Sequence, residues 1–415
     1  MQLVDTLVIG AGQAGLAMSR CLRDRGVEHV VLERGRVAER WRSERWDSLR
    51  LLTPNWQSRL PGHRYSGPEP DEYMTMPEVV AYLDGYARSF AAPVEEETRV
   101  VSLAALGGGY CVGTDRGSFE ARSVVIATGH CDVPFVPPFA KALPADVAQV
   151  VPTRYRNPDE LPEGGVLVVG ASASGVQLAD EIHASGRPVT LAVGRHTRLP
   201  RVYRGRDILW WFDAMGLFEE TGAEVFDLEL SRRQPSLQLV GRPDRATLDL
   251  PELERRGIRL VGRATSVDGA TVSFADDLVA HTAAADARLA RLIQRIDAFA
   301  ASSGIAAEVG TPEPFRPFVW PAEAPSSIDL RAEGIRTVVW ATGFRRLYPW
   351  LELPVLDARG EIRHSGGVTP VPGLYVIGLN FLRRRKSSFI DGVGDDARAL
   401  AGYIVARRRG GRAVA

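Results

Sequence analysis

The feature that most constrains this 415-residue chain is a glycine-rich turn that occurs twice, each time between a short apolar run and a helical pattern. The first turn reads GAGQAG at residues 10–15, and the second reads GASASG at residues 170–175. Strand, glycine turn and helix begin a βαβ unit, whose turn can hold the pyrophosphate of a dinucleotide. The repetition therefore predicts two dinucleotide-binding domains.

Short runs of Val, Ile and Leu recur along the chain, and they show no alternation of polar and apolar residues. They lie at residues 6–9, 27–32, 123–126, 166–169, 189–193, 337–340 and 374–377. Such runs are typical of parallel strands covered on both faces. The predicted fold class is α/β with two Rossmann-like domains. We expect residues 1–150 and 335–415 to form one discontinuous domain and residues 151–334 to be a domain inserted in it.

The first turn has the residue types that a bound dinucleotide requires. Gly10 permits the tight turn, Gly12 lets a pyrophosphate approach the backbone, and Gly15 lets the helix pack against the strand. The N-terminus of that helix then faces the phosphates. Glu33 ends the next strand, where its carboxylate can accept hydrogen bonds from ribose hydroxyls.

Later segments favour FAD over NAD at this first site. The turn containing Thr128 and Gly129 follows a strand, and Gly378 ends a late strand that precedes a helix. Both features recur in flavoproteins with two dinucleotide sites, where the closing helix points its N-terminus at the flavin ring. Phe389 lies on the approach to that helix, and either the flavin pocket or ordinary core packing can account for it.

The second turn carries Ser172 and Ser174 between Gly170 and Gly175, and both serines are small enough for close approach of a phosphate. The strand after it ends at Arg195, where a NAD-specific site would carry Asp or Glu. An arginine can pair with a 2′-phosphate, which favours NADPH. The alternative is a surface arginine beside an NADH site.

With both sites placed, the chain resembles the flavin-containing monooxygenase family, including its plant indole-pyruvate (YUCCA-type) members. The two glycine turns match the FAD and NADPH fingerprints of that family, and WATGF at residues 340–344 matches its second Ala-Thr-Gly turn. ERWR at residues 39–42 and RWDSLRLLTPN at residues 45–55 are similar to the segment that wraps the flavin. The resemblance covers about residues 1–200 and 335–400.

The resemblance implies FAD and NADPH as cofactors and a set of site residues. Asn55 stands where the family has an asparagine that contacts the flavin and its oxygen adduct, which makes it the catalytic candidate; the alternative is a loop asparagine that serves only a turn. The expected cofactor-binding residues are Gly10, Gly12, Gln13, Ala14, Gly15, Glu33, Arg34, Trp41, Arg42, Thr128, Gly129, Gly170, Ser172, Ser174, Gly175, Arg195, Thr342, Gly343, Gly378 and Phe389.

The implied activity is that of an NADPH-dependent flavin monooxygenase, which oxygenates a small organic substrate with dioxygen through a flavin peroxide. One motif departs from the family: F-x-G-x-x-x-H should place a histidine near residue 151, and this chain reads QVVPTR at residues 149–154. Two alternatives therefore stay open. One is an NAD(P)H-dependent reductase or oxidase that does not oxygenate its substrate, and the other is a redox-sensing flavoprotein without turnover.

Composition narrows the partners that this protein can be expected to bind. Lys plus Arg and Asp plus Glu both number 51, so no net charge favours nucleic acid or a membrane surface as a partner.

The three cysteines show no Cys-x-x-Cys spacing, which argues against a redox dithiol and a zinc site, and we expect no metal. The N-terminus lacks the pattern of a signal peptide and no run is long enough to span a membrane, so we expect a cytoplasmic protein. Relatives of this architecture are often dimers, so a homodimer is possible.

Residues 200–330 are the least informative part of the sequence. Residues 289–299 are typical of an amphipathic helix, residues 275–285 of a surface segment, and the aromatic triplet at 210–212 of a helix packing face. Elsewhere, Cys131 is interpreted as a small apolar filler. The basic run at residues 383–386 is interpreted as a solvated face or a phosphate contact.

Overall fold

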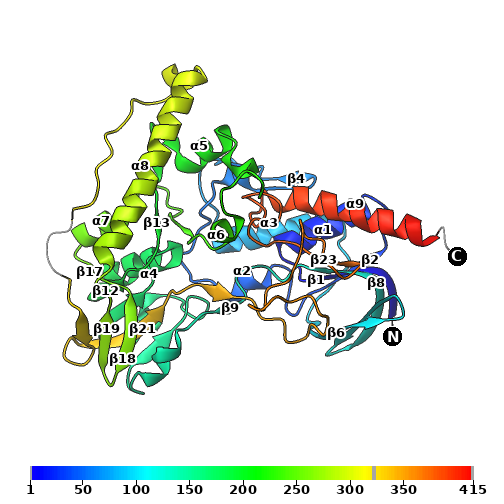
Figure 1. Cartoon of the computed structure of the whole chain (residues 1–415), viewed down its shortest axis with the longest axis horizontal. Coiled ribbons are helices and arrows are strands. Elements are labelled where there is room, and N and C mark those ends of the chain that lie inside the picture. The colour runs from blue at the N-terminus through cyan, green and yellow to red at the C-terminus, as the bar shows by residue number, and fades with distance from the viewer. Residues whose placement is uncertain (1, 320–323, 413–415) are drawn as a thin grey trace.

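The computed structural model describes residues 2–319 and 324–412, and Figure 1 shows two sheets on opposite sides of the molecule. In the first sheet the strands β5, β2, β1 and β8 are parallel, β7 and β6 continue antiparallel, and β23 pairs in parallel with the end of β8. These strands are β5 (Val94–Glu95), β2 (His29–Leu32), β1 (Gln2–Ile9), β8 (Gly117–Ile126), β7 (Gly109–Thr114), β6 (Val100–Leu106) and β23 (Leu374–Val376).

The second sheet has five parallel strands in the order β10, β21, β11, β12, β17. They are β10 (Ala148–Val150), β21 (Ile335–Trp340), β11 (Gly165–Val169), β12 (Val189–Ala192) and β17 (Arg259–Val261). A mixed sheet and a parallel sheet, each with a glycine turn after one of its parallel strands, confirm the predicted α/β class. The strands at 148–150 and 335–340 lie just outside the range 151–334, so the second sheet takes one strand from each flank of the expected insert.

Helices cover both sheets because their apolar faces match the buried faces of the strands. In the first half, α1 (Gln13–Arg23) packs beside α9 (Val393–Arg412), and α3 (Met76–Ser89) packs near α1. The capping box of Thr75 and Glu78 fixes the start of α3. In the second half, α4 (Ala173–Ala184) packs on β11 and β12, and α7 (Leu250–Arg255) lies next to α4.

The part of the insert that the sequence left unassigned contains α5 (Ile208–Ala214), α6 (Leu228–Arg232) and the long helix α8 (Leu278–Ser302), which stands at the outer side in Figure 1. The insert also contains an antiparallel sheet of three strands, β18 (Ala264–Asp268), β19 (Thr271–Phe274) and β20 (Ser327–Asp329). Residues 275–285 lie at the surface, as interpreted, with Asp276, Val279, Ala280, Ala283 and Ala284 exposed. The inner face of α8 buries Leu278, Thr282 and Ala285. The helix expected at 289–299 is confirmed as part of α8, and Trp211 is fully buried in α5.

The two passages of the chain between the halves run side by side. In them β9 (Val133–Pro134) pairs antiparallel with β22 (Phe344–Arg345). The remaining short elements are α2 (Glu39–Ser43), β3 (Arg59–Leu60), β4 (His63–Arg64), β13 (Thr197–Arg198), β14 (Val202–Tyr203), β15 (Arg206–Asp207) and β16 (Leu237–Gln238), with 3-10 turns at Asn55–Gln57, Pro138–Ala142, Pro158–Glu160, Leu217–Glu219 and Ile305–Ala307. Among the described helices, none has the length and apolar character needed to cross a membrane.

Candidate functional site

The first glycine turn is closed so tightly that two of its glycines cannot be replaced without movement of the backbone. Gly10 has φ of +107°, and a Cβ there would lie 2.7 Å from the carbonyl oxygen of Ala127. A Cβ on Gly15 would lie 1.8 Å from the carbonyl oxygen of Gly10. A Cβ on Gly12, in contrast, would meet no atom of the described residues within 4 Å. The turn is therefore rigid on its inner side and open at Gly12, where a ligand can approach the backbone.

The surroundings of this turn suit a dinucleotide. Gly12 is the N-cap of α1 in extended conformation, and no described side chain caps the helix, so its first N–H groups remain available. Glu33 is 9% exposed, and its carboxylate accepts hydrogen bonds from the N–H groups of Ala11 at 2.8 Å and Gly35 at 3.1 Å. These two bonds fix the carboxylate at the end of β2, and each oxygen keeps a further lone pair for a ribose hydroxyl.

The second turn repeats the same closure. Gly170 has φ of +109°, and a Cβ there would lie 2.3 Å from the carbonyl oxygen of Ala341. A Cβ on Gly175 would lie 1.7 Å from the carbonyl oxygen of Gly170. Ala127 and Ala341 each begin an Ala-Thr-Gly turn, so each of these turns packs against one glycine turn. The sequence identified both Ala-Thr-Gly motifs but did not show this contact.

A segment of the insert lies over the second turn, and sequence reasoning missed it. The N–H of Ala173, at the start of α4, donates to Ser236 Oγ at 3.3 Å. Gln238 is fully buried and donates through Nε2 to the carbonyl oxygen of Ala171 at 2.6 Å, while its Oε1 has no hydrogen-bond partner in the described part of the chain. Neither residue stands in a motif, so only the folded chain reveals that they border the second site.

Arg195 is exposed at the end of the strand that follows the second turn, as expected, and it has cationic neighbours. Arg288 of α8 donates to the carbonyl oxygen of His196 at 2.7 Å. Burial first, and then repulsion from Arg195 and Arg291, lowers the pKa of Arg288. A cluster of guanidinium groups at this point can attract a phosphate. The second arginine comes from α8, far along the chain in a region without a motif, so the sequence could not place it.

The expected flavin-wrapping segment is held by ion pairs within the first half of the molecule. Arg34 pairs with Glu44 at 3.3 Å, and Arg42 pairs with Asp84. Trp41 is half-buried, with the Arg45 guanidinium 5.2 Å above its ring centroid. The side chains of Arg34 and Arg42 therefore hold the segment in place, and their contact with a cofactor stays a prediction.

Asn55 is buried, with 4% of its surface exposed, and both ends of its amide are engaged. Its Nδ2 donates to the carbonyl oxygen of Glu69 at 2.8 Å, and its Oδ1 accepts from the N–H of Met74 at 2.8 Å. The side chain thus holds the loop between residues 55 and 75 together. One N–H of the amide remains for another acceptor, so its catalytic role stays a prediction.

Two polar groups beside Asn55 are buried without a partner among the residues described. They are Oε1 of Gln57 and Oγ of Ser58, whose residues are 2% and 0% exposed. Buried polar atoms without a hydrogen bond are destabilising unless something satisfies them. A polar cofactor edge lying against this segment would satisfy them, so the segment fits the flavin that the sequence places here.

The late segments gather at the first turn. A Cβ on Gly378 would lie 2.8 Å from the Cβ of Ala14, so the end of β23 touches the start of α1. Gln13 donates through Nε2 to the carbonyl oxygen of Ser388 at 3.4 Å. Phe389, in contrast, packs against Phe218 of the insert with ring centroids 5.8 Å apart. Gly378 is thereby joined to the first site, whereas Phe389 also serves the apolar cluster of the insert.

The four residues of the two Ala-Thr-Gly turns that we expected to bind cofactor lie beside the glycine turns. Thr128 and Gly129 follow Ala127 and are half-buried. Thr342 donates through Oγ1 to the carbonyl oxygen of Phe135, and Gly343 accepts a hydrogen bond from the N–H of Phe135 at 2.8 Å. The second Ala-Thr-Gly turn is therefore tied to the passage between the two halves.

Cys131 follows the first Ala-Thr-Gly turn and is half-buried, and its polar neighbours go beyond the interpretation as an apolar filler. Burial opposes ionisation of the thiol, but His130, Arg45 and Arg40 outweigh burial, and the pKa of Cys131 falls. The same pairing raises the pKa of His130 against the effect of burial. A histidine hydrogen-bonded to a cysteine among arginines favours a thiolate. The adjacent His130 and Cys131 were the available signal in the sequence. Across the described residues, no group of three or more His, Cys, Asp or Glu could hold a metal ion.

Comparison with known proteins agrees with this geometry. Residues 7–204 match the family model described as pyridine nucleotide-disulphide oxidoreductase. An uncharacterized CzcO-like oxidoreductase of Geobacillus kaustophilus is 35% identical over 407 residues, which are 97% of this chain and 99% of the relative. The indole-3-pyruvate monooxygenase YUCCA4 of Oryza sativa is 35% identical over 191 residues, which are 42% of this chain and 43% of the relative.

A solved structure supports the fold over the full length. The flavin-containing monooxygenase from Stenotrophomonas maltophilia superposes with a TM-score of 0.67 at 21% identity, covering 98% of this chain and 99% of that chain. The chain belongs to the flavin-containing monooxygenase-like flavoproteins, and within them to the CzcO-like oxidoreductases. It is an enzyme, an oxidoreductase, and membership of this family agrees with FAD and NADPH as its cofactors.

Proposed function

We propose that the first turn binds FAD, that the second turn binds NADPH, and that the enzyme adds one oxygen atom of dioxygen to a small organic substrate. The other oxygen atom leaves as water, with two electrons and one proton from NADPH and a second proton from solvent. FAD supplies the chemistry that connects a hydride donor with dioxygen. The likeness to YUCCA4, a monooxygenase by name, covers 42% of this chain and supports oxygenation.

The single observation that carries this assignment is the pair of glycine turns with opposite charges beside them. Glu33 fixes a carboxylate beside the first turn, which suits ribose hydroxyls and repels a 2′-phosphate. Arg195 and Arg288 place positive charge beside the second turn, which suits the 2′-phosphate of NADPH. The same backbone device is therefore set for two different dinucleotides.

The residues of this chain have three tasks in such a reaction. The free N–H groups at the start of α1 bind a pyrophosphate, and Glu33 orients the ribose next to it. The segment held by Arg42 and Asn55 covers the flavin region and excludes water. The remaining N–H of Asn55 is a donor that can stabilise negative charge developing on oxygen.

The stoichiometry of the reaction tests the proposal. Purified protein is supplied with NADPH in a closed cell, and NADPH, dioxygen and hydrogen peroxide are followed while candidate substrates are added. A substrate that accelerates NADPH oxidation and suppresses hydrogen peroxide release, with a product heavier by one oxygen atom, supports oxygenation. Release of one hydrogen peroxide per NADPH with every candidate contradicts it.

A second function is favoured by two observations. The F-x-G-x-x-x-H histidine is missing at residues 149–154, and the neighbouring His130 lowers the pKa of the Cys131 thiol. Both suit an enzyme that passes electrons from NADPH to an acceptor without oxygenating it. Complete coupling of NADPH oxidation to reduction of an added disulfide or quinone under nitrogen would select this function.

A further inference from the structure

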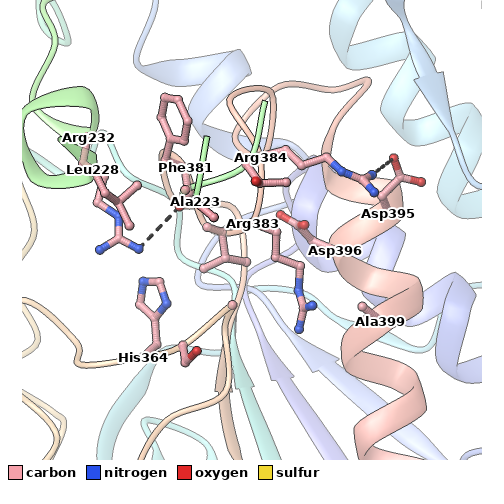
Figure 2. Close-up of a pocket in the computed structure, with 15 residues that line it drawn as sticks. Ala223, Leu228, Arg232, His364, Phe381, Arg383, Arg384, Asp395, Asp396 and Ala399 are labelled. Carbon is pink, nitrogen blue, oxygen red and sulfur yellow. Dashed lines mark hydrogen bonds and ion pairs between the residues drawn. The ribbon is translucent and has the colours of Figure 1, made fainter. Parts of the chain in front are cut away.

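A cavity of about 580 Å³ lies between the insert and the start of α9, and no residue of either glycine turn lines it. Its walls come from residues 221–223, from α6, from residues 364–366, from residues 381–384 and from α9. Figure 2 shows Arg232 and His364 on one side, Asp395, Asp396 and Ala399 on the other, and Arg383 between them. None of the residues that the sequence assigned to a cofactor lines it.

The basic residues beside this cavity differ in whether a carboxylate neutralises them. The basic run at 383–386 supplies four cations, and three of them are ion-paired: Arg384 with Asp395 at 2.9 Å, Arg385 with Glu220 at 2.6 Å, and Lys386 with Glu219 at 2.5 Å. These pairs tie the loop to the insert and to α9. The interpretation of the run as a solvated face or a phosphate contact therefore does not hold for these three residues.

Arg383 is the exception in this run. Within residues 2–319 and 324–412 it forms no ion pair, and its Nε is buried without a hydrogen-bond partner. Its guanidinium lies close over Gly366, where a Cβ would come within 3.1 Å of Cζ, and 5.7 Å from the ring centroid of Tyr403. A half-buried guanidinium that lacks a carboxylate favours an anionic partner from outside the chain.

The opposite wall adds two donors. Arg232 has a buried Nε without a partner in the described residues, while its Nη1 meets Glu229 at 3.2 Å and its Nη2 donates to the carbonyl oxygen of Phe381 at 3.4 Å. His364 accepts at Nδ1 from the N–H of Gly367 at 3.3 Å, so in the neutral ring the hydrogen lies on Nε2. Burial, then repulsion from Arg232 and Arg346, lowers the pKa of His364 to about 4, which keeps the ring neutral at pH 7.

Asp396 supplies a contrasting group to the same cavity. Its side chain belongs to a residue that is 1% exposed, and its Oδ2 has no hydrogen-bond partner within the described part of the chain. Such a buried oxygen requires a donor. Ser387 donates a hydrogen bond to this carboxylate and the charge of Arg383 also acts on it. Arg383, which forms no ion pair among the described residues, and Asp396, one of whose oxygens lacks a hydrogen bond there, therefore line the same cavity. Leu228, Phe381 and Leu382 add apolar surface to it.

We propose that this cavity binds a small zwitterion with an apolar side group, of the amino-acid type. Arg383 and Arg232 hold its carboxylate, Asp396 accepts from its ammonium group, and Leu228 with Phe381 contacts its side group. No residue of either glycine turn lines this cavity, so the proposal adds a ligand to the protein beyond the two dinucleotides.

Equilibrium binding measured without NADPH tests this proposal on the purified full chain. The probes are L-phenylalanine, which has both charges, 3-phenylpropionate, which lacks the ammonium group, and phenethylamine, which lacks the carboxylate. We expect L-phenylalanine to bind at least tenfold more tightly than either of the other two. Equal binding of all three probes, or no binding of L-phenylalanine, would overturn the proposal.

Two variants and one control assign the charges. Arg383→Gln is expected to weaken L-phenylalanine at least tenfold and to leave phenethylamine unchanged, and Arg383→Lys is expected to lose less. Asp396→Asn is expected to remove the preference for L-phenylalanine over 3-phenylpropionate. Arg409→Gln, at an exposed position far along α9, is the matched control and should bind as the wild type does.

Unchanged binding in Arg383→Gln and Asp396→Asn would contradict the site even if L-phenylalanine binds. Thermal unfolding of each variant shows whether it is folded, and Arg383→Lys keeps the test informative if Arg383→Gln is not. Because no flavin turnover enters the measurement, failure of this site leaves the proposed reaction open, and failure of the reaction leaves the site open.

Discussion

The two glycine turns share one backbone and differ in their surroundings. In both, the last glycine packs against the carbonyl oxygen of the first, and an Ala-Thr-Gly turn packs against that first glycine. The first turn is open at Gly12, whereas Ser236 and Gln238 lie over the second. We therefore propose that the turn determines how a dinucleotide can be held. On this proposal the neighbours of the turn determine which dinucleotide binds and how readily it enters and leaves.

We expect the largest loss of function from replacing the last glycine of each turn, and we expect the two replacements to affect different cofactors. Gly15→Ala and Gly175→Ala each place a Cβ less than 2 Å from a backbone oxygen, at 1.8 Å and 1.7 Å respectively. We expect Gly15→Ala to be purified without flavin. Gly175→Ala should keep the flavin and lose at least a hundredfold in the rate of reduction by NADPH. Flavin absorbance per chain and anaerobic stopped-flow reduction measure the two. Loss of flavin from both variants alike would refute the separate assignment.

A second change tests the open position of the first turn. Gly12→Ala adds a methyl group where no described atom lies within 4 Å, at a φ of −80° that alanine adopts. We expect the apoprotein to unfold at the wild-type temperature while FAD affinity falls at least tenfold, because the methyl group occupies the pyrophosphate's approach. Unchanged FAD affinity would show that the pyrophosphate does not pass Gly12.

The charge contrast between the turns depends most on Arg195. Arg195→Gln removes one cation from the proposed 2′-phosphate site, and loss of one such contact costs about 1.5–3 kcal/mol. We expect the KM for NADPH to rise about tenfold or more. NADH lacks the 2′-phosphate and is the internal control, so its KM should stay within about twofold. An equal rise for both nucleotides would mean that Arg195 acts on the fold of the site rather than on the phosphate.

The two Ala-Thr-Gly turns also differ in the residues that come after them: His130 and Cys131 after the first, Phe344 after the second. The pKa of Cys131 is lowered, whereas burial raises the pKa of Cys21 to about 11. A thiol is ionised above its pKa, so at pH 7 Cys131 should be alkylated by iodoacetamide well before Cys21. His130→Gln should move the pH profile of Cys131 alkylation upward. Mass spectrometry of the modified peptides reads this out, and faster labelling of Cys21 would contradict it.

We expect the smallest effect, a change in NADPH affinity, from replacing Ser236, which lies over the second turn. Ser236→Ala frees the N–H of Ala173, which now donates to Ser236 Oγ at 3.3 Å. A neutral hydrogen bond of this kind contributes about 0.5–1.5 kcal/mol. If the N–H must be released before a phosphate binds, the Kd for NADPH should fall about twofold or threefold. A weaker affinity would instead assign Ser236 to the bound state as a phosphate ligand.

The sequence predicts the parts of this molecule that depend on local chemistry. Gly10, Gly15, Gly170 and Gly175 are required by the turns themselves, and Glu33 follows from its place at a strand end, so all were identified without a structure. Ser236, Gln238 and Arg288 could not be found in this way. They reach the second site through the packing of the insert, and no spacing in the sequence encodes that packing.

Boundaries and charge networks were also beyond sequence reasoning. The strands at 148–150 and 335–340 pair with each other, and the second of them pairs with β11, because parallel ladders form between segments distant in the chain. The run at 383–386 is a row of four basic residues in the sequence. Only the fold shows that three are neutralised by Glu219, Glu220 and Asp395, and that Arg383 is not.

The most direct test of the proposed oxygenation is the reoxidation of the NADPH-reduced enzyme by dioxygen in a stopped-flow spectrophotometer. An oxygenating enzyme should show a transient absorbance at shorter wavelength than that of oxidised flavin, which lasts longer when NADP remains bound and decays faster when a substrate is present. Direct return to the spectrum of oxidised flavin, with one hydrogen peroxide for each NADPH, would contradict oxygenation and select the reductase or oxidase.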